Sequence, residues 1–210
     1  LMPDYKAPLR DINFVLNDFL NSEQHYASLN GCEEVTMDLV DAVINEGAKF
    51  AESVVSPLAA NADEQGCTFD NGKVTTPDGF KQAFKQWADG GWQALSIPAE
   101  EGGQGLPGSV GTVVGEMVGS PSWAFSMYGG LALAPVTCLI NGGTEEQKQR
   151  YIPKILTGEW AGTMCLTEAH CGSDVGLLRT KATPNSDGTY TLQGTKIFIS
   201  GGEQDLTDNI

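Results

Sequence analysis

Histidines, paired cysteines and long apolar runs are all scarce in this 210-residue sequence. The two histidines, His25 and His170, are too few and too scattered for a metal cluster, so no metal is predicted. The five cysteines are odd in number and form no C-x-x-C pair, so neither a disulfide framework nor a zinc knuckle is indicated, and reduced thiols in a cytoplasmic protein are expected. No apolar run approaches the roughly 20 residues that span a bilayer, and residues 1–6 lack the apolar region of a secretory signal.

Basic residues are few as well. The chain has 12 Lys and Arg against 27 Asp and Glu, which gives a net charge of −15. Such an acidic surface works against binding to nucleic acid or to anionic lipid, and neither partner nor membrane insertion is expected. An anionic cofactor is still compatible with this charge, because backbone N–H groups at turns and helix N-termini can bind phosphate locally.

Apolar residues at helical spacing characterise the chain up to Gly158. The spacing predicts a short helix over 12–20 and a longer one that begins at the N-cap Thr36 and is kinked or ended by Pro57. Further helices are predicted over 79–90, 108–119, 122–141 and 144–158, the last opened by the capping box Thr-Glu-Glu-Gln and disturbed at Pro153.

Short β-type segments follow these helices. The expected strands are 163–167, 180–184, 189–193 and 196–200, with Asp187-Gly188 as a hairpin turn between the second and third. Helices first and strands afterwards indicate an α+β fold rather than alternating βαβ units. Four short strands make an incomplete sheet, and the sequence reads as truncated.

Two familiar patterns do not carry their usual chemistry here. Residues 103–108 match G-x-G-x-x-G, but Pro107 lies inside the loop and no acidic residue occurs between 117 and 143, so we expect a flexible glycine-rich connection rather than a dinucleotide site. His170-Cys171 resembles a catalytic Cys/His pair, yet only His25 remains to complete a dyad. A structural turn is expected there.

The turn after Thr167 is more informative. Residues 167–174 place two hydroxyls, those of Thr167 and Ser173, beside Gly172 and a series of backbone N–H groups. Such groups hold a flavin edge or a pyrophosphate without a basic side chain. On composition alone, an ordinary β-turn is the favoured alternative.

This turn is also where a family resemblance becomes specific. Residues 163–174, TMCLTEAHCGSD, resemble the L-T-E-P-x-x-G-S-D signature of acyl-CoA dehydrogenases. Three further stretches agree in the same order: 91–105 with G-W-x-x-L-x-x-P…G-G-x-G, 143–159 with G-T-E-E-Q-K…G-E, and 190–200 with Y-x-L-N-G-x-K-x-W-I-T. The N-terminal extension and the run 172–182 resemble the longer subgroup that includes 3-methylmercaptopropionyl-CoA dehydrogenase.

The resemblance implies a division of the chain. Residues 1–35 would be an N-terminal extension, 36–160 an all-α N-terminal domain, and 161–210 the first strands of a β-barrel-like middle domain. A C-terminal helical domain would be missing. In this family FAD lies between the middle and C-terminal domains.

The resemblance also assigns cofactor contacts by motif. Leu166 and Thr167 would meet the flavin ring, with Met164 among the cofactor-binding residues, and Gly172 and Ser173 would serve the pyrophosphate. Ser173 would also contact the CoA ester. Four positions depart from the family pattern. Phe198, in place of Trp, would cover the flavin face, and Ser200, in place of Thr, would keep a hydroxyl contact. Ala169 replaces Pro and Gly201 replaces Asn.

The implied reaction is α,β-dehydrogenation of an acyl-CoA, with the β-hydride passing to FAD and electron-transferring flavoprotein as the partner. No catalytic base is expected in this chain, because the family's glutamate lies in the missing domain. Glu168 is expected to shape the turn, and the 210 residues alone are expected to be inactive. A homo-oligomer is expected at full length. The alternatives are a flavin-dependent hydroxylase of the same fold and a helical interaction module without cofactor.

Overall fold

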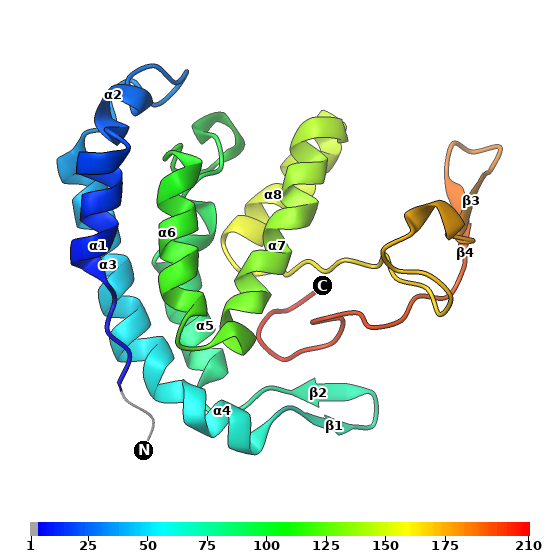
Figure 1. Ribbon diagram of the computed structural model, residues 1–210. Helices are drawn as coiled ribbons and strands as arrows, with labels where there is room; N and C mark the ends of the chain where they lie inside the picture. Colours follow the sequence, from blue (N-terminus) through cyan, green and yellow to red (C-terminus); the bar gives the residue numbers. More distant parts are fainter. Residues whose placement is uncertain (1–3) are drawn as a thin grey trace.

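A computed structural model describes residues 4–210. Residues 1–3, the start of the predicted N-terminal extension and of the segment inspected for a secretory signal, lie outside the described residues. The chain begins with a short helical arm across α3 (Figure 1). Leu16 and Tyr26 anchor this arm in the core, and the Tyr26 hydroxyl lies 2.7 Å from that of Ser109. The arm consists of α1 (Leu9–Asn13), a π-helical turn (Phe14–Phe19) and α2 (Ser22–Tyr26).

The long helix predicted after Thr36 forms as expected. The Thr36 hydroxyl accepts a hydrogen bond from Leu39 N at 3.3 Å, which caps α3 (Met37–Phe50). Pro57 lacks an N–H group, and the helix is disturbed around it without ending there. The axis continues through a π-helical turn (Ala51–Val55) and a 3-10 turn (Ser56–Leu58) into α4 (Ala59–Gln65).

A β-hairpin that the sequence reading missed follows α4. β1 (Thr68–Asp70) pairs antiparallel with β2 (Lys73–Thr75) across Asn71-Gly72. Both turn residues have positive φ, 48° and 82°, as the Asn-Gly pair of a type I′ hairpin turn requires. The Asn-Gly dipeptide could have predicted this hairpin. Because the hairpin lies among the helices, the region predicted to be all-α is not purely helical.

α5 (Phe80–Asp89) ends at Gly90-Gly91 as predicted, and two 3-10 turns follow it, Trp92–Ala94 and Ala99–Glu101. The glycine-rich loop 103–108 then leads from a 3-10 turn, not from a strand, into α6 (Gly108–Gly119). The rejection of a dinucleotide fingerprint is thereby confirmed.

α7 (Trp123–Gly142) and α8 (Glu145–Leu156) complete the helical part of the described chain. α7 packs between α6 and α8, and the predicted capping box is present, with Thr144 N donating to Gln147 Oε1 and Gln147 N to Thr144 Oγ1. The expectation that no apolar segment reaches membrane-spanning length is wrong for α7, which qualifies by length and composition alone. α7 also packs against α6 and α8.

Two apolar clusters hold the helices together. The larger is centred on aromatic side chains, with Phe80 and Phe125 edge to face at 5.5 Å between ring centroids. The smaller lies between α7, α8 and the Trp92–Ala94 turn and includes Val136 and Ile152.

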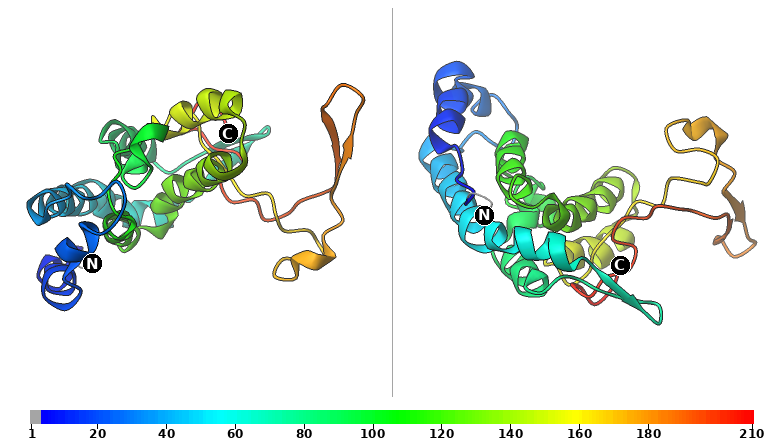
Figure 2. Two further views of the ribbon diagram at one scale, coloured as in Figure 1. Left: turned by 90° about the horizontal axis from the view of Figure 1, so that it is seen from above. Right: turned by 60° about the horizontal axis from the view of Figure 1, so that its bottom comes forward.

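Beyond α8 the chain leaves the helices, and the hairpin of β3 (Lys181–Pro184) and β4 (Tyr190–Gln193) stands apart from them (Figures 1 and 2). The α+β class is confirmed, and the predicted hairpin turn forms, with Gly188 at φ 85°. The strands predicted over 163–167 and 196–200 do not form. These two segments face each other through scattered hydrogen bonds, and no ladder of backbone bonds joins them.

Candidate functional site

Two chain segments distant in sequence lie side by side in opposite directions. Thr163 Oγ1 donates to Ser200 O at 2.5 Å, Lys196 Nζ donates to Leu166 O at 2.9 Å, and Ile197 N donates to Thr167 O at 3.0 Å. These contacts bring together the five residues that the sequence assigned to a flavin ring and its face: Met164, Leu166, Thr167, Phe198 and Ser200.

Apolar side chains on these segments face outward. The side chains of Met164 and Phe198 are 52% and 87% exposed. Phe198 also has φ of +56°, in the left-handed region that a non-glycine residue occupies only at a cost in conformational energy. An exposed aromatic ring on a strained backbone does not stabilise the fold. Such features cluster at binding sites, where a ligand covers the ring.

The turn after Thr167 presents polar groups to the same region. Glu168 and Cys171 exchange two backbone hydrogen bonds, which close the turn. A Cβ atom placed on Gly172 would lie 3.7 Å from Thr167 Oγ1, so the Thr167 hydroxyl and the Gly172 backbone are neighbours. In the described part of the chain, the N–H groups of Gly172 and Ser173 form no hydrogen bond with protein. They are available to an anionic ligand.

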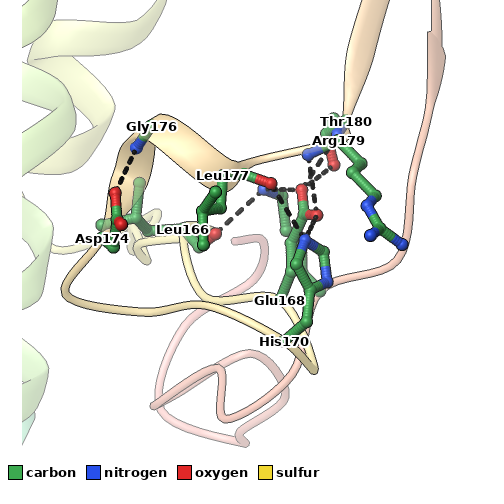
Figure 3. Close-up of polar contacts among 9 residues, drawn as sticks. Leu166, Glu168, His170, Asp174, Gly176, Leu177, Arg179 and Thr180 are labelled. Carbon is green, nitrogen blue, oxygen red and sulfur yellow. Dashed lines mark hydrogen bonds and ion pairs between the residues drawn. The ribbon is translucent and has the colours of Figure 1, made fainter.

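Glu168 is the structural centre of this turn (Figure 3). Its buried carboxylate accepts hydrogen bonds from Arg179 N, Thr180 N and Thr180 Oγ1 at 2.7–2.9 Å and from Lys196 Nζ at 2.9 Å. The Thr180 hydroxyl, the Arg179 amide and the Lys196 ammonium hold the pKa of this carboxyl well below its ordinary value. A carboxylate so stabilised is a poor proton acceptor, which agrees with a structural role for Glu168.

His170 and Cys171 do not form a nucleophilic pair. His170 Nε2 lies 2.9 Å from Leu177 O and 3.7 Å from Glu168 Oε2. Folding does bring ligand atoms of Glu168, His170 and Cys171 within 4.8 Å of one another, which the scattering of the two histidines in the sequence did not suggest. The Lys196 ammonium on Glu168 repels a cation there, and the absence of a bound metal stays a prediction.

An apolar cavity of about 550 Å³ lies between α6, α7 and the turn after α5. Its walls include the aromatic rings of Trp87, Trp92 and Trp123 and the backbone of glycines on both helices. The sequence reading missed this cavity. Its signal was the spacing of glycines along one face of α6, at 108, 111 and 115, opposite the pair 129–130 in α7.

The chain next to the second flavin-assigned segment touches one residue of the cavity wall. A Cβ atom built on Gly201 would lie 3.6 Å from Leu131 Cδ1, and Leu131 lines the cavity. The chain directly after Ser200 therefore rests on a helix that forms the cavity wall. The site comprises an apolar recess beside exposed hydrogen-bonding groups.

The comparison with known families is decisive for this chain. The sequence model of the family described as "Acyl-CoA dehydrogenase, N-terminal domain" matches residues 40–159, more than half of the chain. The chain belongs to the acyl-CoA dehydrogenase family. The predicted family is confirmed.

Relatives of this acyl-CoA dehydrogenase chain agree with that assignment. It is 41% identical to 3-methylmercaptopropionyl-CoA dehydrogenase of Ruegeria pomeroyi over 98% of this chain and 35% of the relative. A solved acyl-CoA dehydrogenase of Bacillus anthracis complexed with FAD is 25% identical with a TM-score of 0.64, over 80% of this chain and 27% of that one. A solved electron transferring flavoprotein of Acidaminococcus fermentans is 26% identical with a TM-score of 0.66, over 80% of this chain and 41% of that one. The chain spans about a third of the length of the curated relatives it matches.

Proposed function

We propose that this chain supplies the helical domain and the first part of the middle domain of a FAD-dependent acyl-CoA dehydrogenase. The reaction is α,β-dehydrogenation of an acyl-CoA thioester. One observation carries the proposal: the segments 163–167 and 196–200, with their exposed apolar and hydroxyl groups, meet each other, and the chain directly after them rests on Leu131 of the cavity wall. Such a site can hold a flat aromatic cofactor against an aliphatic substrate.

The residues present fit FAD. Thr167 and the free N–H groups of Gly172 and Ser173 offer donors to the ring edge and the pyrophosphate, and Phe198 offers an exposed ring to the flavin face. FAD supplies the acceptor for the hydride when it is bound. The chain's own residues orient the cofactor and exclude water from its face. Ser173 is exposed, and its hydroxyl would contact the CoA ester.

The apolar cavity fits the acyl chain. Leu131 and Met127 line it together with the three tryptophans, and few polar groups interrupt the wall. Burial of methylene groups in such a cavity stabilises the bound acyl chain by about 0.8 kcal/mol per methylene. The helical part would therefore set how the substrate chain is held.

The proton acceptor would come from outside these 210 residues. Glu168, the carboxylate nearest to the proposed flavin contacts in sequence, is bound by Lys196 and by backbone N–H groups. We therefore propose that the chain alone is inactive, with residues 1–35 as an extension, 36–160 as the helical domain and 161–210 as part of the middle domain.

The relatives support two further proposals about partners. An electron transferring flavoprotein is proposed as the electron acceptor on the basis of the family resemblance. Homo-oligomerisation at full length and a cytoplasmic location without membrane insertion are also proposed. The net charge of −15 works against binding to nucleic acid. The five free cysteines of the described chain support a reducing compartment.

The test is a visible spectrum of the purified full-length protein, followed by anaerobic addition of a panel of acyl-CoAs. A yellow protein whose flavin absorbance bleaches with one acyl-CoA supports the dehydrogenase. A yellow protein that bleaches with none, and whose reduced flavin reacts with oxygen to hydroxylate a substrate, supports the hydroxylase. A colourless protein that cannot be reconstituted with FAD contradicts both and supports an interaction module.

A further inference from the structure

The last residues of the chain return to the helices. This return segment, residues 201–210, runs back from the exposed hairpin region to the helical part (Figures 1 and 2). Ala161 N donates to Asn209 O at 2.8 Å, and Asp208 N donates to Glu159 O at 3.0 Å. Leu206 is 9% exposed and belongs to the larger helical core cluster. The return segment is thus packed against the helices.

One side chain of the return segment makes a paired contact with the β1–β2 hairpin. Asp205 Oδ1 accepts hydrogen bonds from Thr76 N at 3.0 Å and from Thr76 Oγ1 at 2.8 Å. Thr76 is buried and directly follows β2. A carboxylate that accepts two donors from one residue has little freedom to move, and charge-assisted bonds of this kind are the stronger ones.

The chain next to Asp205 is ordered to present it. The Gln204 side chain accepts hydrogen bonds from Leu206 N and Thr207 N and donates to Thr207 Oγ1, and Gln204 itself is buried. This local turn fixes the direction of the Asp205 side chain. The contact with Thr76 joins residues that are 129 positions apart.

This contact between Asp205 and Thr76, called the clamp below, lies a short distance along the chain from the proposed flavin contacts. Gly201, four positions before Asp205, rests against Tyr128 and Leu131 of α7, and Leu131 lines the apolar cavity. Phe198 and Ser200 immediately precede it. The five positions from Ser200 to Asp205 span at most about 18 Å when fully extended, so a fixed Asp205 limits how far the end of the 198–200 segment can move from the cavity.

We propose that Asp205 is a positioning residue, which through Thr76 holds the flavin-facing segment 198–200 at a fixed distance from the acyl cavity. This inference rests on the proposed function, since it is the flavin and the acyl chain whose separation is set. Loss of the clamp would leave both ligands able to bind and would spoil their alignment. Misplacement of reacting groups by about 1 Å can lower a rate by about a hundredfold.

The test compares full-length Asp205→Ala and Asp205→Asn with wild type. The asparagine amide oxygen can still accept both bonds from Thr76, and Asp208→Ala on the same segment is the matched control, because Asp208 is exposed and its side chain forms no hydrogen bond in the described residues. We expect Asp205→Ala to slow anaerobic flavin reduction by acyl-CoA about tenfold to a hundredfold at saturation. The acyl-CoA concentration at half-saturation should change little, and Asp205→Asn and Asp208→Ala should behave as wild type.

Hydrogen exchange of the FAD-free protein gives an independent readout. The hydrogen-bonded amides of Thr76, Gly202 and Leu206 should lose protection in Asp205→Ala and keep it in Asp205→Asn. Where Asp205→Ala does not fold, Thr76→Val against Thr76→Ser tests the same contact, since only valine removes the hydroxyl donor. A wild-type protein that bleaches together with an Asp205→Ala protein that bleaches equally fast overturns this inference alone. A wild-type protein that never bleaches overturns the proposed function, and unchanged exchange in Asp205→Ala then overturns the clamp as well.

Discussion

The helical part up to α8 and the segment from Trp160 to the end of the chain are stabilised in different ways. The helices bury aliphatic and aromatic side chains in two clusters. After Trp160, the only buried apolar side chain in the described chain is Leu206, and it packs into the helical cluster. The hairpin region is organised by hydrogen bonds to Glu168 instead.

This contrast indicates which part can stand alone. Burial of apolar side chains raises the free energy of unfolding of a region that has its own core. A polar centre near the surface mainly fixes the geometry of the groups around it. Exposed apolar side chains such as Leu192 and Tyr190, 74% and 63% exposed, leave the β3–β4 hairpin without a packed face in these residues. The relatives, of which this chain covers about a third, have the length to cover such a face.

The largest predicted effect separates the two regions by stability. Phe125→Ala removes a ring that packs against Phe80 and Phe50, and should lower the free energy of unfolding by about 3–5 kcal/mol. Leu192→Ala in the hairpin should change it by less than about 0.5 kcal/mol. Urea denaturation followed by helical circular dichroism measures both. Comparable losses for the two variants would contradict a core confined to the helices.

The next prediction concerns the cavity in the helical part. A Cβ atom on Gly130 meets nothing within 4 Å, so Gly130→Leu should fill the cavity without disturbing the fold. We expect the full-length variant to lose about 10-fold to 200-fold in kcat/KM for long acyl-CoAs relative to short ones, while FAD affinity is unchanged. Gly142→Leu, at the end of the same helix with equal free space, is the control. Equal effects of both variants on all chain lengths would exclude the cavity as the acyl site.

A smaller effect is expected at the polar centre of the hairpin region. Lys196→Met removes the ammonium 2.9 Å from Glu168 and should speed amide exchange at Arg179 and Thr180 about tenfold, as expected for loss of a charged hydrogen-bond partner. Lys181→Met, which removes another lysine of the same region, serves as the control. The helical amides should be unaffected, and a global loss of protection would show that the two regions are not independent.

The pH dependence of the same hairpin amides follows from the pKa of Glu168. Because hydrogen bonds lower this pKa in the folded chain, the stabilisation is fully present above the ordinary carboxyl pKa, about 4.3, and is lost as the pH falls toward the folded-state value. NMR spectra recorded from about pH 6 down to about pH 2 should show the hairpin signals changing once the pH falls below about 4.3. Glu168→Gln should remove the dependence, and an unchanged pH profile in that variant would assign it to other carboxyls.

The sequence predicted the helical part better than the hairpin region, for a physical reason. Thr36 and the Thr144–Gln147 box act through neighbouring backbone groups, so local sequence suffices to place both caps. The segment 196–200 has strand-type residues, but a strand forms only with a partner along its edge, and local sequence does not supply one. The cavity and the Asp205–Thr76 contact join distant residues and were therefore out of reach of local patterns.

The arrangement of the candidate site was not predicted from the sequence. The motif around Thr167 and Ser173 only proposed cofactor-facing residues, through the family resemblance. Only the structure showed that Thr167 and Ile197 share a hydrogen bond and that Gly201 rests on α7. Their roles toward FAD stay predictions.

The most direct test of the account is the affinity of the full-length protein, freed of flavin, for FAD. Fluorescence titration of wild type, Thr167→Val and Thr137→Val compares a hydroxyl at the proposed flavin edge with a hydroxyl on the outer side of α7, which donates to Leu133 O. We predict that Thr167→Val weakens FAD binding by about tenfold, the size of one lost hydrogen bond to a bound ligand, and that Thr137→Val binds as wild type. Equal, unaltered affinity in all three proteins would contradict a flavin site at the meeting of segments 163–167 and 196–200.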